Sequence, residues 1–365
     1  MNIYSSIKIL DLTRVFSGPF ATRHFSDFGA EVIKIEPPQG DDSRQFPPIV
    51  DHWSGYFEVL NHNKKSLFLD LKDESDLNKF YTLCKDCDVI VENFTPTVKN
   101  KLHIDYETIK QLNKRIIYAS ISGISATTNK KYYDIIAQAE SGLISLNGKD
   151  EDMKNATSIV DAFSGMKLAY AISTALYNRE VSHEGCQLNV SMKGSAFDLL
   201  EQNLIATSLS SKNPAKVGNM DSAIAPFGIF KTQDSSIALA IGNDNQWETF
   251  AKFMLTQSPT FPTELFSSNS RRLENIDQLI SEIEKIFLQY SSYELMQTLN
   301  QLGITTGKVN KMTDVIEDQE NFKENLLEKV NHPTVGDLVI PTGGIFFSNH
   351  KKEKYLPSPT LSQSK

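Results

Sequence analysis

The stretch Ile7-Lys-Ile-Leu-Asp-Leu-Thr-Arg-Val-Phe-Ser-Gly-Pro-Phe-Ala-Thr-Arg-His-Phe-Ser-Asp-Phe-Gly-Ala-Glu-Val-Ile-Lys-Ile-Glu36 decides the fold. Its first six residues predict a short apolar strand, and its last six predict a second strand. The turn between them ends at Pro19, which suits the first position of a helix, so Phe20–Phe28 predicts a helix that stops at Gly29. Strand, helix and strand within about thirty residues indicate a parallel crossover unit.

The same alternation continues along the chain. Four more apolar segments predict strands: Ser66–Leu71, Asp88–Glu92, Arg115–Ile121 and Gln187–Met192. Helices are predicted at Glu74–Lys85 and Tyr106–Leu112. This pattern indicates an α/β fold with a Rossmann-like parallel sheet, in which ligands bind at the carboxyl ends of the strands. The sequence contains neither G-x-G-x-x-G nor G-x-x-x-x-G-K-[ST], which disfavours a dehydrogenase or a P-loop enzyme.

The pattern changes after a long helix predicted at about Ser195–Ser210. Two alternating segments, Phe227–Thr232 and Ile237–Ile241, predict a hairpin, and three helical segments follow it: Gln246–Met254, Ile276–Phe287 and Tyr293–Leu302. We therefore predict a large Rossmann-like domain over 1–212 with a returning tail at 311–365, and a small α+β domain over 213–310.

Charge and hydropathy exclude several classes of protein. The 365 residues include 37 Lys and Arg against 45 Asp and Glu, a formal net charge of −8. Nucleic acid is disfavoured as a partner because phosphate binding requires a basic surface, although a few local cations can hold a small polyphosphate. The N-terminal segment lacks the pattern of a signal peptide, and no stretch approaches the roughly 18 apolar residues that span a bilayer. We expect a cytoplasmic protein that does not bind membranes.

The cysteines do not predict a disulfide framework or a metal site. Cys84-x-x-Cys87 is half of a zinc or redox motif, but Cys186 is distant and no histidine lies near the pair. A structural zinc ion needs four ligands. We therefore expect no metal.

Asp161 is the main candidate for chemistry. It lies near the start of a predicted helix running from Ser158 to Arg179, where unpaired backbone N–H groups and the helix dipole favour a negative charge. One interpretation is structural, because Ser158-x-x-Asp161 has the spacing of a capping box. The other is a covalent nucleophile, because a carboxylate can carry an acyl group as a mixed anhydride. Gly165, one turn later, leaves room for close approach to the carboxylate.

Ordered motifs favour the second interpretation. They run through nearly the whole chain: Leu10-Asp-Leu-Thr-Arg-Val-x-x-Gly-Pro19, Gly29-Ala-Glu-Val-Ile-Lys-Ile-Glu-x-Pro38, Gly40-Asp41, Asn63-Lys-Lys-Ser66, Leu69-Asp-Leu-Lys72, Asp88-Val-Ile-Val-Glu-Asn-Phe94, Asp134-x-x-Ala-Gln138, Asp161-x-x-x-Gly165, Asn178-Arg179, Gly185-x-Gln187 and Val190-Ser-Met192. Together they resemble the family III CoA-transferases, also called the CaiB/BaiF family.

The resemblance implies an architecture and a mechanism. The architecture is an interlocked homodimer of two-domain chains. In the mechanism, Asp161 attacks the thioester of a donor acyl-CoA and forms a mixed anhydride; the CoA thiolate then converts this to an aspartyl-CoA thioester and releases the donor acid. The carboxylate of a small acceptor acid attacks that thioester, and CoA cleaves the new anhydride. CoA and acyl-CoA are substrates here, and no permanently bound cofactor is implied.

The resemblance also assigns site residues. Asp134 matches an acidic position near the nucleophile, although by itself it reads as the N-cap of a helix over Ile135–Leu146. The positions of CoA contacts fall on eight residues: Val15, Phe16, Leu69, Lys72, Asn93, Phe94, Lys101 and Lys131. Lysines at predicted strand ends suit a ligand with several phosphates.

Two alternatives remain open at this point. An α-methylacyl-CoA racemase or epimerase has the same fold and uses a His-Asp pair, but Tyr133 occupies the position of that histidine and no histidine lies between residues 104 and 182. A non-catalytic acyl-CoA-binding homologue would retain the fold without the activity.

Overall fold

The computed structural model describes residues 2–360 and divides them into two compact units. Unit 1 comprises 2–144, 154–211 and 320–360, and unit 2 comprises 145–153 and 212–319. The predicted boundaries differ at two places, because the sequence analysis assigned 145–153 and 311–319 to the large domain. Apolar periodicity identifies helices and strands but gives no information on which unit a segment between them belongs to.

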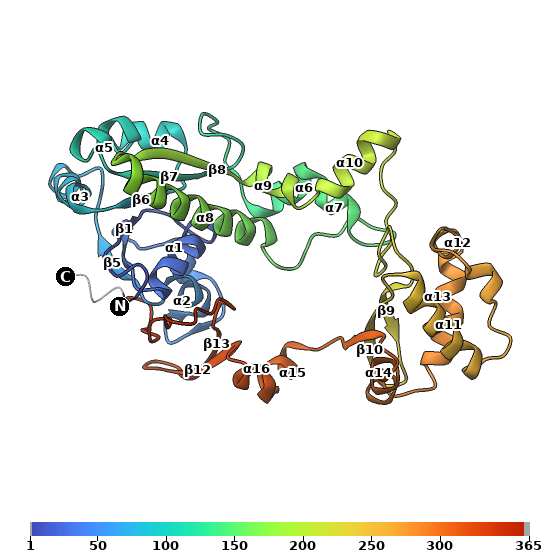
Figure 1. Ribbon diagram of the computed structural model, residues 1–365. Helices are drawn as coiled ribbons and strands as arrows, with labels where there is room; N and C mark the ends of the chain where they lie inside the picture. Colours follow the sequence, from blue (N-terminus) through green and yellow to red (C-terminus); the bar gives the residue numbers. More distant parts are fainter. Residues whose placement is uncertain (1, 361–365) are drawn as a thin grey trace. The chain divides into compact units, whose positions relative to one another are not determined.

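Unit 1 is built on a six-stranded parallel sheet (Figure 1). Its order is β5 (Lys65–Phe68), β2 (Glu31–Glu36), β1 (Lys8–Asp11), β6 (Val89–Glu92), β7 (Ile117–Ser122) and β8 (Cys186–Ser191). Counted along the chain, this is the Rossmann order 3-2-1-4-5-6, which reverses direction between β1 and β6. The predicted α/β fold with a parallel sheet is confirmed.

Alternate residues of the strands enter two different cores, because successive side chains point to opposite faces of a sheet. Ile9, Val91 and Ala119 pack with α1 (Ser17–Asp27) and α8 (Ile159–Ser182) on one face. On the other face, Leu10, Ile90 and Tyr118 pack with α3 (Glu74–Asp86) and α5 (Tyr106–Leu112). Burial on both faces explains why the strands read as continuous apolar runs instead of alternating ones.

Three predicted boundaries in unit 1 were wrong. Helix α1 begins at Ser17, so Pro19 lies inside its first turn instead of at its start. The segment predicted as one helix at Ser195–Ser210 forms α9 (Met192–Asp198) and α10 (Glu201–Ser210). The segment Ile135–Leu146 likewise forms two helices, α6 (Asp134–Ser141) and α7 (Leu143–Leu146), because Gly142 takes a left-handed conformation between them.

The remaining elements of unit 1 are short. They are η1 (Asp42–Gln45), β3 (Ile49–Val50), β4 (Trp53–Ser54), α2 (Gly55–Asn61), α4 (Pro96–Lys101), α16 (Gln319–Lys323), β12 (Leu327–His332) and β13 (Gly336–Pro341). β12 and β13 form a hairpin, whereas the sequence predicted strand character over Val335–Phe347. The following tail is anchored at Glu58, whose carboxylate accepts hydrogen bonds from Tyr355 Oη at 2.5 Å and Ser358 Oγ at 2.6 Å.

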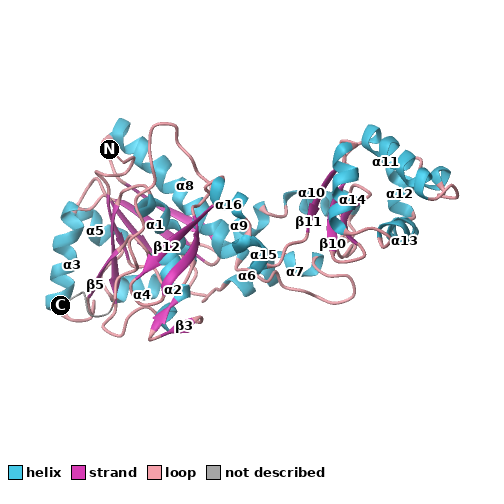
Figure 2. Ribbon diagram, turned by 90° about the horizontal axis from the view of Figure 1, so that it is seen from below, coloured by secondary structure: helices cyan, strands magenta, loops and turns pink. Residues whose placement is uncertain are grey.

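Unit 2 is an α+β unit around a three-stranded antiparallel sheet of order β11 (Thr305–Lys308), β10 (Ser236–Ala240), β9 (Phe227–Lys231). Figure 2 shows the strands beside the helices α11 (Asp244–Gln257), α12 (Asn269–Glu274), α13 (Ile276–Phe287) and α14 (Ser292–Gln301). The core is rich in aromatic side chains, among them Phe230, Trp247 and Phe266. η2 (Thr263–Phe266) and α15 (Met312–Glu317) complete the unit.

Within the described residues, no helix is long and apolar enough to cross a membrane, and no group of three or more His, Cys, Asp or Glu side chains forms a metal site. All three cysteines are free thiols, and Cys84 and Cys87 are buried, where the Cys87 thiol donates to the Cys84 carbonyl at 3.6 Å.

Candidate active site

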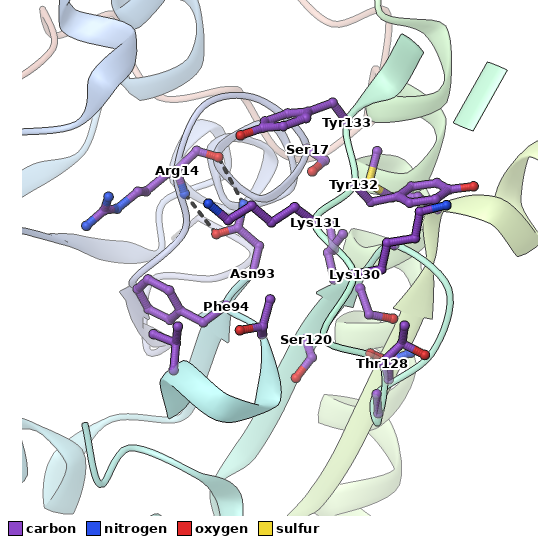
Figure 3. Close-up of a pocket in the computed structure, with 18 of the residues that line it drawn as sticks. Arg14, Ser17, Asn93, Phe94, Ser120, Thr128, Lys130, Lys131, Tyr132 and Tyr133 are labelled. Carbon is purple, nitrogen blue, oxygen red and sulfur yellow. Dashed lines mark hydrogen bonds between the residues drawn. The ribbon is translucent and has the colours of Figure 1, made fainter. Parts of the chain in front are cut away.

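The turn after β1 is held in a strained conformation. Val15 has φ 68°, in the left-handed region that β-branched residues rarely adopt, and such a residue costs about 1–3 kcal/mol. The side chain of Asn93, which follows β6, clamps the preceding residue: Asn93 Oδ1 accepts from Arg14 N at 3.1 Å and Asn93 Nδ2 donates to Arg14 O at 3.0 Å (Figure 3). Since β1 and β6 flank the reversal of strand order, this clamp lies at the expected ligand-binding point of the sheet.

A buried charge network supports the same turn from below. Lys34 Nζ donates to Thr13 O at 2.7 Å and pairs with Asp41 at 2.9 Å, and both charged side chains are almost completely buried. Asp11 pairs with Lys64 at 3.0 Å, again without solvent exposure. Removing one partner of such a pair would leave an uncompensated buried charge, which costs about 3–5 kcal/mol. Several motif residues therefore fix the turn instead of facing a ligand.

Asp161 lies in the first turn of α8, and Asp134 caps that helix. Asp134 Oδ1 accepts from the backbone N–H of Val160 at 2.9 Å and of Asp161 at 3.2 Å. Ser158 makes no capping hydrogen bond with its side chain, so the capping-box interpretation of Ser158 and Asp161 was wrong. Asp134 was expected to be the N-cap residue of α6, but Tyr133 is that residue. Asp134 instead accepts hydrogen bonds from the first turn of α8.

The surroundings of the Asp161 carboxyl group make it a weaker acid than an ordinary aspartic acid. Burial and the neighbouring charge of Asp134 raise its pKa to about 7, although a hydrogen bond from the Ser17 side chain acts in the opposite direction. Gly165 allows the close approach that was expected, and the approaching group is the chain itself: a Cβ at this position would lie 2.5 Å from Ser17 O. The glycine therefore lets α1 and α8 pack together at the carboxylate.

Asp161 lines a cavity of about 370 Å³. Figure 3 shows labelled side chains of its wall, among them Asn93, Phe94 and Lys131. Its wall includes five of the eight predicted CoA contacts: Val15, Phe16, Asn93, Phe94 and Lys131. The loop after β7 supplies the opposite wall, including Thr128 and Tyr133, and Ser120 contributes from β7 itself. The nucleophile candidate is thus accessible to a ligand at the carboxyl ends of the strands.

A second cavity of about 470 Å³ lies next to the first. Both cavities are lined by Arg14, Phe94 and Val98, so they share a wall. The second contains the predicted residues Leu69, Lys72 and Lys101. We call the two cavities together the groove.

The groove is rich in cations that lack a carboxylate partner. Within the described part of the chain, Arg14, Lys72, Lys101 and Lys131 form no ion pair, whereas Lys99 and Lys130 in the first cavity are paired with Glu92 and Glu140. The acidic groups at the second cavity are already engaged: Glu36 is paired with Arg44 at 2.7 Å, and Asp70 accepts from Lys72 N at 3.1 Å. A chain of net charge −8 therefore presents positive groups at this groove.

Three residues that contribute to the site were not identified from the sequence. Arg14 lines both cavities. It could have been predicted from the sequence, because it lies just after the predicted first strand. Tyr56 was not found because α2 was not predicted; burial and the charge of Asp161 raise its pKa to about 12. Gln138 was quoted as part of a motif, but no role was assigned to it.

Comparisons with known proteins identify the family. The model of CoA-transferase family III matches residues 4–365. An acetyl-CoA:oxalate CoA-transferase from Acetobacter aceti is 33% identical, over 99% of this chain and 93% of its own length. A succinyl-CoA:glutarate CoA-transferase from Mus musculus is 31% identical, over 100% of this chain and 85% of its own length.

A solved structure shows the same fold. A CaiB/BaiF family protein from Brucella suis superposes with a TM-score of 0.87 at 27% sequence identity, covering 99% of this chain and 97% of that one. The chain is an enzyme of the CoA-transferase type. It belongs to CoA-transferase family III.

Proposed function

We propose that this enzyme transfers CoA from an acyl-CoA donor to a small carboxylic acid, with Asp161 as the covalent nucleophile. The observation that carries the proposal is the position of the Asp161 carboxyl group, which lines one cavity of a groove whose other cavity presents the unpaired Lys72 and Lys101. An acyl-CoA has its thioester and its phosphates at opposite ends of one molecule, so the groove suits its shape and charge. CoA enters and leaves as a substrate, and the cycle requires no resident cofactor.

The covalent steps balance as follows. The Asp161 carboxylate attacks the donor carbonyl and expels CoA thiolate, which leaves a mixed anhydride on the enzyme. The thiolate then attacks the aspartyl carbonyl of the anhydride, so the donor acid leaves as a carboxylate and an aspartyl-CoA thioester forms. The acceptor carboxylate attacks that thioester and again expels CoA thiolate. This thiolate attacks the acceptor carbonyl of the new anhydride, which releases acceptor acyl-CoA and restores the Asp161 carboxylate.

Positioning is the principal contribution that the protein makes to these steps. A carboxylate is a weak nucleophile, but holding it against a bound thioester gives a large entropic advantage. The Asn93 clamp, the strained Val15 turn and the Asp134 cap fix the two backbone segments on either side of the reaction centre. Backbone N–H groups at the start of a helix are also suited to stabilise developing negative charge on oxygen.

Trapping with hydroxylamine tests the proposal. Protein is mixed with succinyl-CoA or acetyl-CoA, treated with hydroxylamine and measured by intact mass and peptide mapping. The expected result is a hydroxamate at Asp161 that is absent from Asp161→Ala. A panel of short dicarboxylic, hydroxy and branched acids then identifies the acceptor by formation of a new acyl-CoA.

The same experiment separates the alternatives. A racemase or epimerase would exchange the α-proton of a branched acyl-CoA with deuterium from solvent without a covalent adduct, and an acyl-CoA-binding homologue would give neither signal. Within the described residues, the lining of both cavities includes no histidine to serve as the base of a racemase, which favours the transferase.

We also propose that the enzyme is a homodimer, with the two chains interlocked. One face of α8 exposes Tyr170, Tyr177 and Val181, which are 74%, 76% and 70% accessible and lie in one stripe at helical spacing. An apolar stripe of this kind on a soluble unit is typical of an interface, and a second copy of the chain would cover it. The expected mass by light scattering is that of two chains, and Tyr177→Asp is expected to shift it toward one chain.

A further inference from the structure

Gln138 contacts two segments that lie next to the first turn of α8, which carries Asp161. It is completely buried on α6, in the motif Asp134-x-x-Ala-Gln138. Its carboxamide makes hydrogen bonds in two directions: Nε2 donates to Asp134 Oδ2 at 2.5 Å, and Oε1 accepts from Asn155 N at 2.8 Å. Nε2 also approaches Thr157 O at 3.5 Å. One side chain thus contacts both the cap of α8 and the segment that enters α8.

The contact with Asp134 determines how that carboxylate is oriented. Asp134 Oδ1 accepts the N–H groups of Val160 and Asp161, so the second oxygen, Oδ2, faces away from the helix toward Gln138. Without the amide donor, Oδ2 would lose its buried partner, and the carboxylate would be free to rotate away from α8 toward water. An acceptor left without its hydrogen-bond partner is destabilising, and more so when it is charged.

The contact with Asn155 fixes the chain that leads into the helix. Asn155 Oδ1 in turn accepts from Thr157 N at 3.2 Å and Thr157 Oγ1 at 3.1 Å, and α8 starts two residues later. Gln138 therefore restrains the start of α8 from the side and from the incoming segment. The Asp161 carboxyl group is carried on that first turn, so its position depends on both restraints.

Resting on the transferase function proposed above, we propose that Gln138 is a positioning residue for acyl transfer to Asp161, acting through the Asp134 carboxylate and the Asn155–Thr157 segment. It touches neither the acyl group nor CoA. Its loss reduces the rate of the covalent step, because a misplacement of about 1 Å is sufficient to reduce a rate about 100-fold. The binding of the CoA portion depends on the rest of the groove and stays unchanged.

The chain offers a matched control in Asn113, which precedes β7 at the opposite edge of the sheet from the carboxyl ends. Its carboxamide also bridges backbone segments: Nδ2 donates to Cys84 O at 3.0 Å and Cys87 O at 2.9 Å, and Oδ1 accepts from Arg115 N at 3.0 Å. Asn113→Leu removes a comparable set of hydrogen bonds from the same unit without touching the start of α8.

The experiment compares wild type, Gln138→Leu, Gln138→Glu and Asn113→Leu. Gln138→Glu keeps the size and the acceptor for Asn155 N but replaces the donor to Asp134 with a second carboxylate. The rate of hydroxamate formation at Asp161 with succinyl-CoA or acetyl-CoA and hydroxylamine is measured in single turnover. Affinity for CoA is measured by calorimetry, and Tm is measured for each variant.

Both Gln138 variants are expected to form the hydroxamate about 10-fold more slowly or worse, with CoA affinity within twofold of wild type. Asn113→Leu is expected to lower Tm without changing the rate. Equal rates for wild type and a folded Gln138 variant, or equal slowing in Asn113→Leu, would overturn the proposal. A wild-type protein that forms no adduct would instead contradict the transferase function itself, so the two failures are distinguishable.

Discussion

The two cavities of the groove are built in opposite ways. Around Asp161, the walls are fixed by buried contacts: the Asn93 amide clamps Arg14, Asp134 caps α8, and a network of buried ion pairs supports the turn at Val15. The other cavity presents Lys72 and Lys101, two exposed ammonium groups on long side chains. One end of the groove is built from hydrogen-bonded and largely buried groups, and the other presents exposed side chains.

This difference corresponds to two different demands. A covalent step requires atoms held within a fraction of an ångström, which only packed and hydrogen-bonded groups provide. Phosphate recognition by lysine tolerates variation in distance, because a compact charge attracts an anion from many directions. We therefore expect substitutions at the buried end to change the rate of chemistry, and substitutions at the exposed end to change binding.

The largest effect is expected for Asp161→Asn, which keeps the size of the side chain and removes its nucleophilic oxygen. The rate of CoA transfer is expected to fall by about 10⁴-fold or more, as when other covalent nucleophiles are removed. Calorimetry should show CoA affinity close to that of wild type. Transfer at a rate within tenfold of wild type would remove Asp161 from the mechanism.

A second effect is expected on the pH profile. In the proposed mechanism Asp161 attacks as the carboxylate. Its pKa is raised to about 7, so turnover should increase with pH up to about 7 and then level. Below that value the rate should fall about tenfold for each pH unit, or about 100-fold by pH 5. In Asp134→Asn the charge that raises this pKa is removed, so the acid limb should move to lower pH; an unmoved limb would show that another group controls it.

Releasing the strained turn is expected to have a smaller effect. Asn93→Ala removes two hydrogen bonds from the Arg14 backbone, with a loss of about 1–3 kcal/mol in the free energy of unfolding. The turnover rate should fall about tenfold, because Val15 can then relax from its left-handed conformation. Chemical denaturation and steady-state kinetics measure the two effects. A loss of stability with unchanged turnover would mean that the turn does not need to be rigid.

The smallest effect is expected at the exposed end. Lys72→Ala and Lys101→Ala should each raise KM for acyl-CoA about threefold to tenfold with little change in kcat, and should weaken the dependence of KM on salt. Lys85→Ala, an exposed lysine of α3 outside both cavities, is the control and should match wild type. A lower kcat with unchanged KM in the lysine variants would contradict the assignment of CoA binding to the cavity at Lys72 and Lys101.

The sequence predicted the fold more accurately than the contacts at the site. The strands of the parallel sheet were located because their residues are apolar on both faces, and the turn residues between them are local signals. Predictions failed where a tertiary contact replaced a local one. Ser158 has the spacing of a cap, but the Asp134 carboxylate, which is 24 residues earlier in the chain, takes that role.

Motif residues also acquired different roles in three dimensions. Asn93 was predicted to contact the ligand, and its amide is occupied by the Arg14 backbone, although its side chain still lines the cavity. Lys34 and Asp41 belong to recognised strings, and both are buried under the turn. A sequence motif identifies residues that resemble those of the family. It does not distinguish residues that contact a ligand from residues that support the backbone.

By itself, the sequence determined the alternation of strands and helices, the net charge and the family resemblance, and it indicated Asp161 as the candidate nucleophile. These follow from composition, from the local spacing of residues and from motifs that occur in the same order as in the family. Only the tertiary structure decided that Asp134 and Gln138 contact the start of α8 and its incoming segment, that Asn93 clamps the turn at Val15, and that four unpaired cations line the two cavities. These arrangements join residues that are tens of positions apart, and their energies depend on burial and distance, which no local pattern encodes.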